Sequence, residues 1–198
     1  MTDADSSNRI PLLAALEVVA RTRREEIVVT TMGSAREWPK LSQHPLDFHY
    51  LPSAMGQSPL IALGLAMAMP ERRVIAFTGD GSLLMNLGCL VTIAAAAPKN
   101  LTVIALDNGR YEVTGGQMTA GAVNAVEFAA VAAASGFAQS HEFDALDYWR
   151  QGWDELRSAN GPTFITLDVA PVGPDYQLVV PGPMRSRLAA FRAALSGA

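Results

Sequence analysis

The fold class of this chain is decided by residues 74–82, which read Val74-Ile75-Ala76-Phe77-Thr78-Gly79-Asp80-Gly81-Ser82. The apolar and β-branched residues 74–78 indicate a strand that is buried on both faces. The glycines that follow indicate a tight turn, and an apolar helix is expected over 83–97, ending at Pro98. A buried strand that passes through a glycine turn into a helix is typical of a parallel α/β sheet.

The same alternation extends along the chain. We expect further strands over 27–31, 101–106, 137–139 and 163–167, and helices over 10–23, 57–69, 124–134, 144–158 and 185–195. Asn124 and Glu127 have the spacing of a capping box at the start of the third of these helices. We therefore expect an α/β fold, a doubly wound and mainly parallel sheet with helices on both faces. It forms one domain over residues 10–198, after a flexible tail over residues 1–9.

The composition excludes several classes of protein. Of the 198 residues 49% are apolar, which allows a large core, and a net charge of −4 with no basic block argues against nucleic-acid binding. The single cysteine, Cys89, lies in an apolar run and is expected to be a buried thiol. Residues Met1–Asp5 do not resemble a signal peptide, and the longest apolar stretch, Ile61–Met69, is too short to span a bilayer. We expect a soluble, cytoplasmic protein with no membrane partner.

The loop after the strand at 74–78 is the first candidate site. Ligands of open parallel sheets bind beyond the carboxyl ends of the strands. Gly79 and Gly81 allow the backbone to approach an anion closely, and Asp80 could hold a hard cation. Taken alone, the motif is more often only a strand-to-helix turn. A dinucleotide fingerprint fits poorly, because Leu84 stands where the third glycine belongs.

The loop after the strand at 101–106 is the second candidate. It reads Asp107-Asn108-Gly109-Arg110-Tyr111 and is expected beside the first loop. Mg²⁺ prefers six oxygen ligands, which usually include substrate phosphates. Asp80, Asn108 and one backbone carbonyl supply three oxygens, so a diphosphate and a water could complete the shell.

With these motifs the sequence resembles the thiamine diphosphate (ThDP) enzymes. It is most similar to the diphosphate-binding domain, either the β subunit or the C-terminal domain, of phosphonopyruvate and sulfopyruvate decarboxylases. The resemblance covers about residues 27–169. The motifs that carry it, in order, are Thr30-Thr31-Met32-Gly33-Ser34-Ala35-Arg36-Glu37, Ser53-Ala54-Met55-Gly56, Gly79-Asp80-Gly81-Ser82, and Asn108-Gly109 followed by Gly115-Gly116-Gln117.

The resemblance implies a role for each matching residue. The side chains of Asp80 and Asn108 and the carbonyl of Arg110 are implied as Mg²⁺ ligands. Donors to the diphosphate are implied at Gly33, Ser34, Gly81 and Ser82, and Gly79 is implied as a further cofactor-binding residue. Met55 falls where the family has an apolar residue that wedges the cofactor into its bent form. The Ser53 carbonyl falls near the acceptor for the aminopyrimidine amine, although glycine is usual there. Tyr111 is expected beside the cofactor or, equally, packed on the loop.

One catalytic group is missing. The family places the glutamate that protonates the pyrimidine ring on a second domain, and this sequence has room only for the diphosphate-binding one. Glu112 lies on the same loop as Asn108 and is badly placed to reach the pyrimidine. The catalytic residue is therefore unknown in this chain. We expect a pyrimidine-binding, α-like partner subunit, a hetero-oligomer with a dimeric or tetrameric core, and a small 2-oxo acid as the substrate.

Two other functions stay open. The chain could be the β-like subunit of a 2-oxo-acid:acceptor oxidoreductase, which also shows Gly-Gly-Gln after the asparagine, or a ThDP-binding module without catalysis. The remaining polar and aromatic residues have ordinary interpretations. His44 and His49 are expected to be loop histidines, His141 a surface histidine, Arg36 and Glu37 a solvated pair, and Trp149 and Trp153 packing residues of an amphipathic helix.

Overall fold

The computed structural model describes residues 9–173 and 182–197. Its centre is a six-stranded parallel sheet. The strands lie in the order β2 (Asp47–His49), β1 (Ile27–Thr30), β3 (Val74–Gly79), β4 (Leu101–Asp107), β8 (Thr163–Asp168) and β7 (Gln139–Phe143). A separate antiparallel hairpin consists of β5 (Arg110–Tyr111) and β6 (Gln117–Met118). The expected parallel α/β sheet is confirmed.

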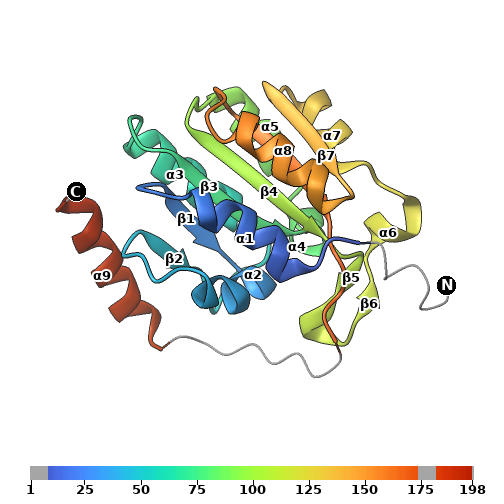
Figure 1. The fold of residues 1–198 in the computed structure, drawn as a ribbon, viewed down its shortest axis with the longest axis horizontal. Helices are drawn as coiled ribbons and strands as arrows, with labels where there is room; N and C mark the ends of the chain where they lie inside the picture. The colour runs from blue at the N-terminus through green and yellow to red at the C-terminus, as the bar shows by residue number, and fades with distance from the viewer. Residues whose placement is uncertain (1–8, 174–181, 198) are drawn as a thin grey trace.

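Helices cover both faces of the sheet (Figure 1). One face packs against α3 (Ser58–Ala68), α5 (Cys89–Ala96) and α7 (Phe128–Ser135), and the other against α1 (Leu12–Thr22) and α8 (Leu146–Leu156). Shorter helical segments are α2 (Met32–Glu37), η2 (Trp38–Lys40), α4 (Asp80–Leu84), η3 (Glu112–Thr114) and α6 (Ala120–Asn124). The last helix, α9 (Met184–Ser196), lies beside β2, where Phe191 stacks on Phe48 with ring centroids 5.0 Å apart.

Two tryptophans join α8 to α1. Trp149 and Trp153 are buried, as the helical spacing of these residues predicts. Their indole N–H groups donate to the Ala15 carbonyl at 2.9 Å and to the Thr22 hydroxyl at 2.8 Å. Each ring thus buries its apolar body while its one polar group is satisfied. Within the described chain both tryptophans serve the core.

Two expected helices differ from the prediction. The helix predicted over 83–97 is divided into α4 and α5, and the one predicted over 124–134 begins later, at Phe128, as α7, while α6 ends at Asn124. The capping box predicted for Asn124 and Glu127 is wrong. Asn124 donates back to the Ala120 carbonyl at 2.9 Å, and Glu127 makes no side-chain cap bond to α7. The break follows Asn124 because Ala125 takes a left-handed conformation, with φ 49°.

Other segments differ in extent. Strand β7 begins at Gln139, where the predicted strand over 137–139 ends, and β2, α2 and the β5–β6 hairpin were not predicted. Arg9, at the end of the expected tail, pairs with Asp168 at 3.1 Å, whereas residues 1–8 lie outside the described part of the chain. Within residues 9–173 and 182–197, none of the helices has the length and apolar character needed to cross a membrane.

Cys89 provides a test of the core. Its side chain is buried at the start of α5, and burial raises the pKa of the thiol to about 11. The thiolate is the reactive species. We therefore expect the native protein to react only slowly with a thiol reagent such as DTNB at pH 8. The protein unfolded in guanidinium chloride should release one equivalent of thionitrobenzoate at once, since the sequence has one cysteine. Fast labelling of the native protein would contradict the packing of α5.

Candidate functional site

A cavity at the carboxyl ends of β1, β3 and β4 collects the predicted site residues; we call it the inner cavity. It is lined by every one of them except Ser53. The predicted residues along its wall are Gly33, Ser34, Met55, Gly79, Asp80, Gly81, Ser82, Asn108, Arg110 and Tyr111. These residues come from four separate loops. The tertiary fold thus brings the motifs together, while their chemical roles stay predictions.

The β3–α4 turn provides the floor of the inner cavity. Gly79 precedes α4 with φ −85°, and a methyl group added there would meet no atom within 4 Å. A methyl group at Gly81 would lie only 2.4 Å from Cε1 of Tyr111. The Tyr111 ring therefore packs directly on the loop, which is one of its two predicted positions, and it also lines the cavity. Ser82 accepts the Gly56 N–H at 2.8 Å and keeps its own proton for a further bond.

Asp80 is almost completely buried, with 1% of its surface exposed. Its Oδ2 accepts a hydrogen bond from the Thr119 hydroxyl at 2.8 Å. Burial raises the pKa of Asp80, while hydrogen bonds from Thr119, the Gly81 backbone and Asp107 lower it. For Asp107, burial and then the charge of Asp80 raise the pKa to about 6. The buried carboxyl group of Asp80 and the half-buried one of Asp107 thus influence each other, an arrangement that a bound cation would stabilise.

The loop after β4 is held by local hydrogen bonds. Asp107 Oδ1 accepts the Gly109 N–H at 3.0 Å, and Asn108 Oδ1 accepts the Arg110 N–H at 2.8 Å. Gly109 takes a positive φ of 69°, which glycine adopts readily. The Arg110 guanidinium donates to the Gly116 carbonyl at 3.1 Å, within the β5–β6 hairpin. These hydrogen bonds define the conformation of the backbone around Asn108.

The loop after β1 has a different construction. The Ser34 hydroxyl donates to the Thr31 carbonyl at 2.7 Å and accepts the Thr31 N–H at 3.0 Å. The Ser34 N–H in turn donates to the Thr31 side chain, which completes a capping box, so the hydroxyl and the N–H of Ser34 are both engaged within α2. Met32 has a positive φ of 47°, a strained conformation that is found at functional sites. Ser53 does not line the inner cavity, and its hydroxyl accepts a hydrogen bond from Thr31 Oγ1 at 3.1 Å.

The histidines and the Arg36–Glu37 pair lie outside this arrangement. His49 is on β2 rather than in a loop, so its predicted position is wrong. Its Nδ1 contacts the Thr30 hydroxyl at 2.8 Å, and burial lowers its pKa. His44 accepts the Leu46 N–H at 3.2 Å in a loop, as predicted. His141 is half-buried on β7 rather than on the surface. Arg36 pairs with Glu37 at 3.4 Å, but Glu37 is buried, so the prediction of a solvated pair is wrong.

The sequence did not predict Thr119 as a site residue, and it did not predict that Glu112 lines the inner cavity. Thr119 follows the Gly115-Gly116-Gln117 motif by two residues, which is the only signal for it in the sequence. Glu112 lines the inner cavity, and its Oε1 accepts the Val172 N–H at 2.5 Å. Burial raises the pKa of Glu112. Both residues connect the loop after β4 to neighbouring loops.

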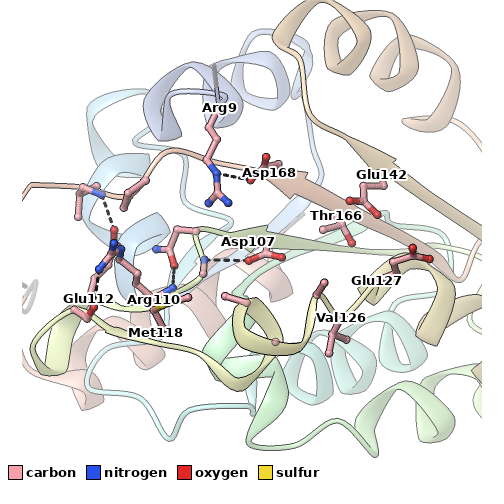
Figure 2. A pocket seen from close by; sticks show the side chains of 18 of the residues that line it. Arg9, Asp107, Arg110, Glu112, Met118, Val126, Glu127, Glu142, Thr166 and Asp168 are labelled. Atoms are coloured by element: carbon pink, nitrogen blue, oxygen red, sulfur yellow. Dashed lines mark hydrogen bonds and ion pairs between the residues drawn. The ribbon is translucent and has the colours of Figure 1, made fainter. Parts of the chain in front are cut away.

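A second, larger cavity of about 850 Å³ lies at the carboxyl ends of β4, β8 and β7 (Figure 2). We call it the outer cavity. It meets the inner cavity at Asn108, Arg110 and Glu112. Its charged residues are Asp107, Glu112, Glu127, Glu142 and Asp168, with Arg9 and Arg110. Among the described residues, however, no three acidic, histidine or cysteine side chains are grouped closely enough to hold a metal ion by themselves.

Comparison with known proteins identifies the family. Residues 29–167 match the family described as "Thiamine pyrophosphate enzyme, C-terminal TPP binding domain". The chain belongs to this family. Thiamine pyrophosphate is another name for ThDP. The solved benzoylformate decarboxylase of Polynucleobacter necessarius has the same fold, with a TM-score of 0.69 over 90% of this chain and 36% of that chain at 18% identity.

Two curated relatives are more similar in sequence. A phosphonopyruvate decarboxylase of Streptomyces viridochromogenes is 38% identical over 191 residues, which cover 94% of this chain and 47% of the relative. The chain thus spans about half the length of that relative. Sulfopyruvate decarboxylase subunit beta of Methanothermobacter thermautotrophicus is 36% identical over 168 residues, which cover 84% of this chain and 86% of the relative.

The two glycines of the β3–α4 turn give a paired prediction. Gly79→Ala should leave the thermal midpoint unchanged, because the added methyl meets no protein atom, but should weaken ThDP binding by filling the inner cavity. Gly81→Ala should lower stability by about 1–3 kcal/mol, because the methyl displaces Tyr111. Thermal unfolding and calorimetric ThDP titration measure the two effects. Full ThDP affinity in Gly79→Ala would show that the cofactor binds elsewhere.

Proposed function

We propose that this chain is the diphosphate- and Mg²⁺-binding part of a ThDP-dependent 2-oxo-acid decarboxylase of the phosphonopyruvate and sulfopyruvate type. The convergence of four loops on the inner cavity, with Asp80 and Asn108 on its wall, is the observation that carries the proposal. The names of the two relatives support decarboxylation of an acid with a second anionic group.

The residues present fit the cofactor and its metal. The proposed ligands are a carboxylate, an amide and a backbone carbonyl, and oxygen donors of this kind suit Mg²⁺. The interaction between the carboxyl groups of Asp80 and Asp107 would favour the binding of a cation beside them. The open space over Gly79 allows a diphosphate to approach the backbone.

Each residue would then have a defined part. Asp80, Asn108 and the Arg110 carbonyl would hold Mg²⁺, and Ser82 with backbone N–H groups of the β1 and β3 loops would bind the phosphates. Met55 would pack against the middle of the cofactor and set its orientation. When bound, ThDP supplies the electron sink that allows a 2-oxo acid to lose CO₂. Tyr111 and Glu112 would close the metal side of the cavity.

The acid that protonates the pyrimidine ring would come from another polypeptide. The carboxylates on the wall of the inner cavity are Asp80, which bonds Thr119, and Glu112, which bonds the Val172 N–H. Both would lie on the metal side of the bound cofactor. The similarity to a relative named "subunit beta", over 86% of its length, supports a hetero-oligomer with a pyrimidine-binding partner.

A second candidate is the β-like subunit of a 2-oxo-acid:acceptor oxidoreductase. The Gly115-Gly116-Gln117 motif after Asn108 favours it. A decarboxylase releases CO₂ and an aldehyde with no acceptor, whereas the oxidoreductase needs an electron acceptor. The sequence has one cysteine, so an iron–sulfur cluster would have to be carried by another chain.

Asp80→Ala tests the metal site. It should weaken Mg²⁺-dependent ThDP binding by more than about tenfold, since a metal ligand contributes at least as much as its supporting residues. The variant should still fold, with a lower thermal midpoint, because the buried Thr119 hydroxyl loses its acceptor at a cost of about 1–3 kcal/mol. Calorimetric ThDP titration in Mg²⁺ measures the affinity. Asp154→Ala, at an exposed position of α8, is the control. Equal affinities for Asp80→Ala and its control would sink the assignment.

A reconstitution assay tests the shared active site. The purified chain alone, with ThDP and Mg²⁺, should release no CO₂ from pyruvate, phosphonopyruvate or sulfopyruvate. Addition of a pyrimidine-binding chain that carries the missing glutamate should produce turnover, because general acid–base catalysis requires a group within hydrogen-bond reach. Turnover that depends on an added electron acceptor would instead support the oxidoreductase. Robust CO₂ release by the chain alone would falsify the proposed division of the site.

A further inference from the structure

Thr119 lies where the two metal loops meet. It follows β6 directly, precedes α6, and is completely buried. Its hydroxyl donates to Asp80 Oδ2 at 2.8 Å and accepts the Ala122 N–H at 3.2 Å, so its donor and one acceptor position are both used. A side chain from the hairpin region, 39 residues further along the chain, thus holds the carboxylate at the end of β3.

The backbone and the methyl group of Thr119 add two more contacts. Its N–H donates to the Gly109 carbonyl at 2.9 Å, within the loop that carries Asn108. Its Cγ2 would lie 3.2 Å from a methyl group added at Gly81. One buried residue therefore touches the aspartate, the glycine beside it and the loop of the second proposed ligand.

The direction of the hydroxyl bond restricts Asp80. An ionised carboxylate only accepts hydrogen bonds, so the Thr119 proton goes to Oδ2 and occupies one lone pair there. This bond fixes the rotation of the carboxylate about its last side-chain torsion, which is otherwise broad. Residues that orient a ligand in this way typically change metal affinity by about 10- to 100-fold when they are replaced.

We propose that Thr119 is a positioning residue that orients the Asp80 carboxylate toward the metal and holds the β3 and β4 loops in register. The inference rests on the proposed function, because it assumes that Asp80 binds a cation. The competing explanation is that Thr119 only caps α6 through its bond with the Ala122 N–H. The two explanations differ in their effect on the choice of metal.

Metal selectivity separates positioning from simple stability. Mg²⁺ demands near-ideal octahedral geometry, whereas Ca²⁺ tolerates irregular and larger shells. A misoriented Asp80 should therefore impair Mg²⁺ more than Ca²⁺. Loss of a helix cap, by contrast, lowers the folded population and weakens ThDP binding equally with either ion.

Thr119→Val and Thr119→Ser are the test pair. ThDP is titrated calorimetrically into the full chain with Mg²⁺ or with Ca²⁺, and thermal midpoints are recorded in parallel. Thr119→Val keeps the shape but loses the hydroxyl. We expect it to lose about 10- to 100-fold in Mg²⁺-supported affinity and clearly less with Ca²⁺. Thr119→Ser keeps both hydrogen bonds and should behave like the unmodified chain. Asn124→Ala, which removes a bond within α6 without touching Asp80, should leave the Mg²⁺-to-Ca²⁺ ratio unchanged.

The outcomes are distinct. Equal losses with both ions in Thr119→Val, or no loss, would overturn the positioning role while leaving the proposed function intact. Absence of ThDP binding by the unmodified chain with either ion would overturn the proposed function and this inference with it. Should Thr119→Val fail to fold, Thr119→Cys, with a weak S–H donor of similar size, must show the same shift in selectivity.

Discussion

The burial of one carboxylate, Asp80, is the constraint on which the site depends. Removing an ionised group from water costs several kcal/mol unless hydrogen bonds or opposite charge replace the lost solvation. The fold supplies hydrogen bonds from the Thr119 hydroxyl and from backbone N–H groups, yet burial still raises the pKa of Asp80. A cation bound at the end of β3 would offset the remaining electrostatic cost.

The order of the strands turns this local arrangement into a site. β1, β3 and β4 are neighbours and are parallel, so their carboxyl ends lie along one edge of the sheet. Gly79 stands opposite Leu106 in the register, which places the loop of Asp80 beside the loop of Asn108. Helices packed on both faces keep the strands from sliding, because a shift in register would expose the core. The inner cavity is therefore a consequence of the sheet rather than of any single loop.

The outer cavity extends this edge toward β8 and β7. Asp107 stands opposite Asp168, and Glu142 opposite Thr166, so these side chains lie on the same face of the sheet at its carboxyl end. Burial raises the pKa of Glu142, and the charge of the neighbouring carboxylates raises it further. Arg9 offsets part of this charge through its pair with Asp168. A bound anion would consequently find its favourable electrostatic environment at the N–H groups of the β3–α4 turn, away from this acidic side.

The sequence by itself determined the sheet and the identity of the loops. Runs such as Val74–Thr78 are apolar on both faces, so the buried strands can be predicted from consecutive residues. The turn at Gly109 can be predicted in the same way, because glycine readily takes the positive φ found there. The hairpin, the break after Asn124 and the position of Ser53 away from the inner cavity were decided by tertiary packing. The same holds for Thr119, because its partner Asp80 is distant in sequence and nothing in the local pattern specifies that contact. Contacts between a ligand-binding side chain and its supporting residue depend on the tertiary fold. Buried strands and glycine turns, by contrast, depend on residues that are neighbours in the sequence.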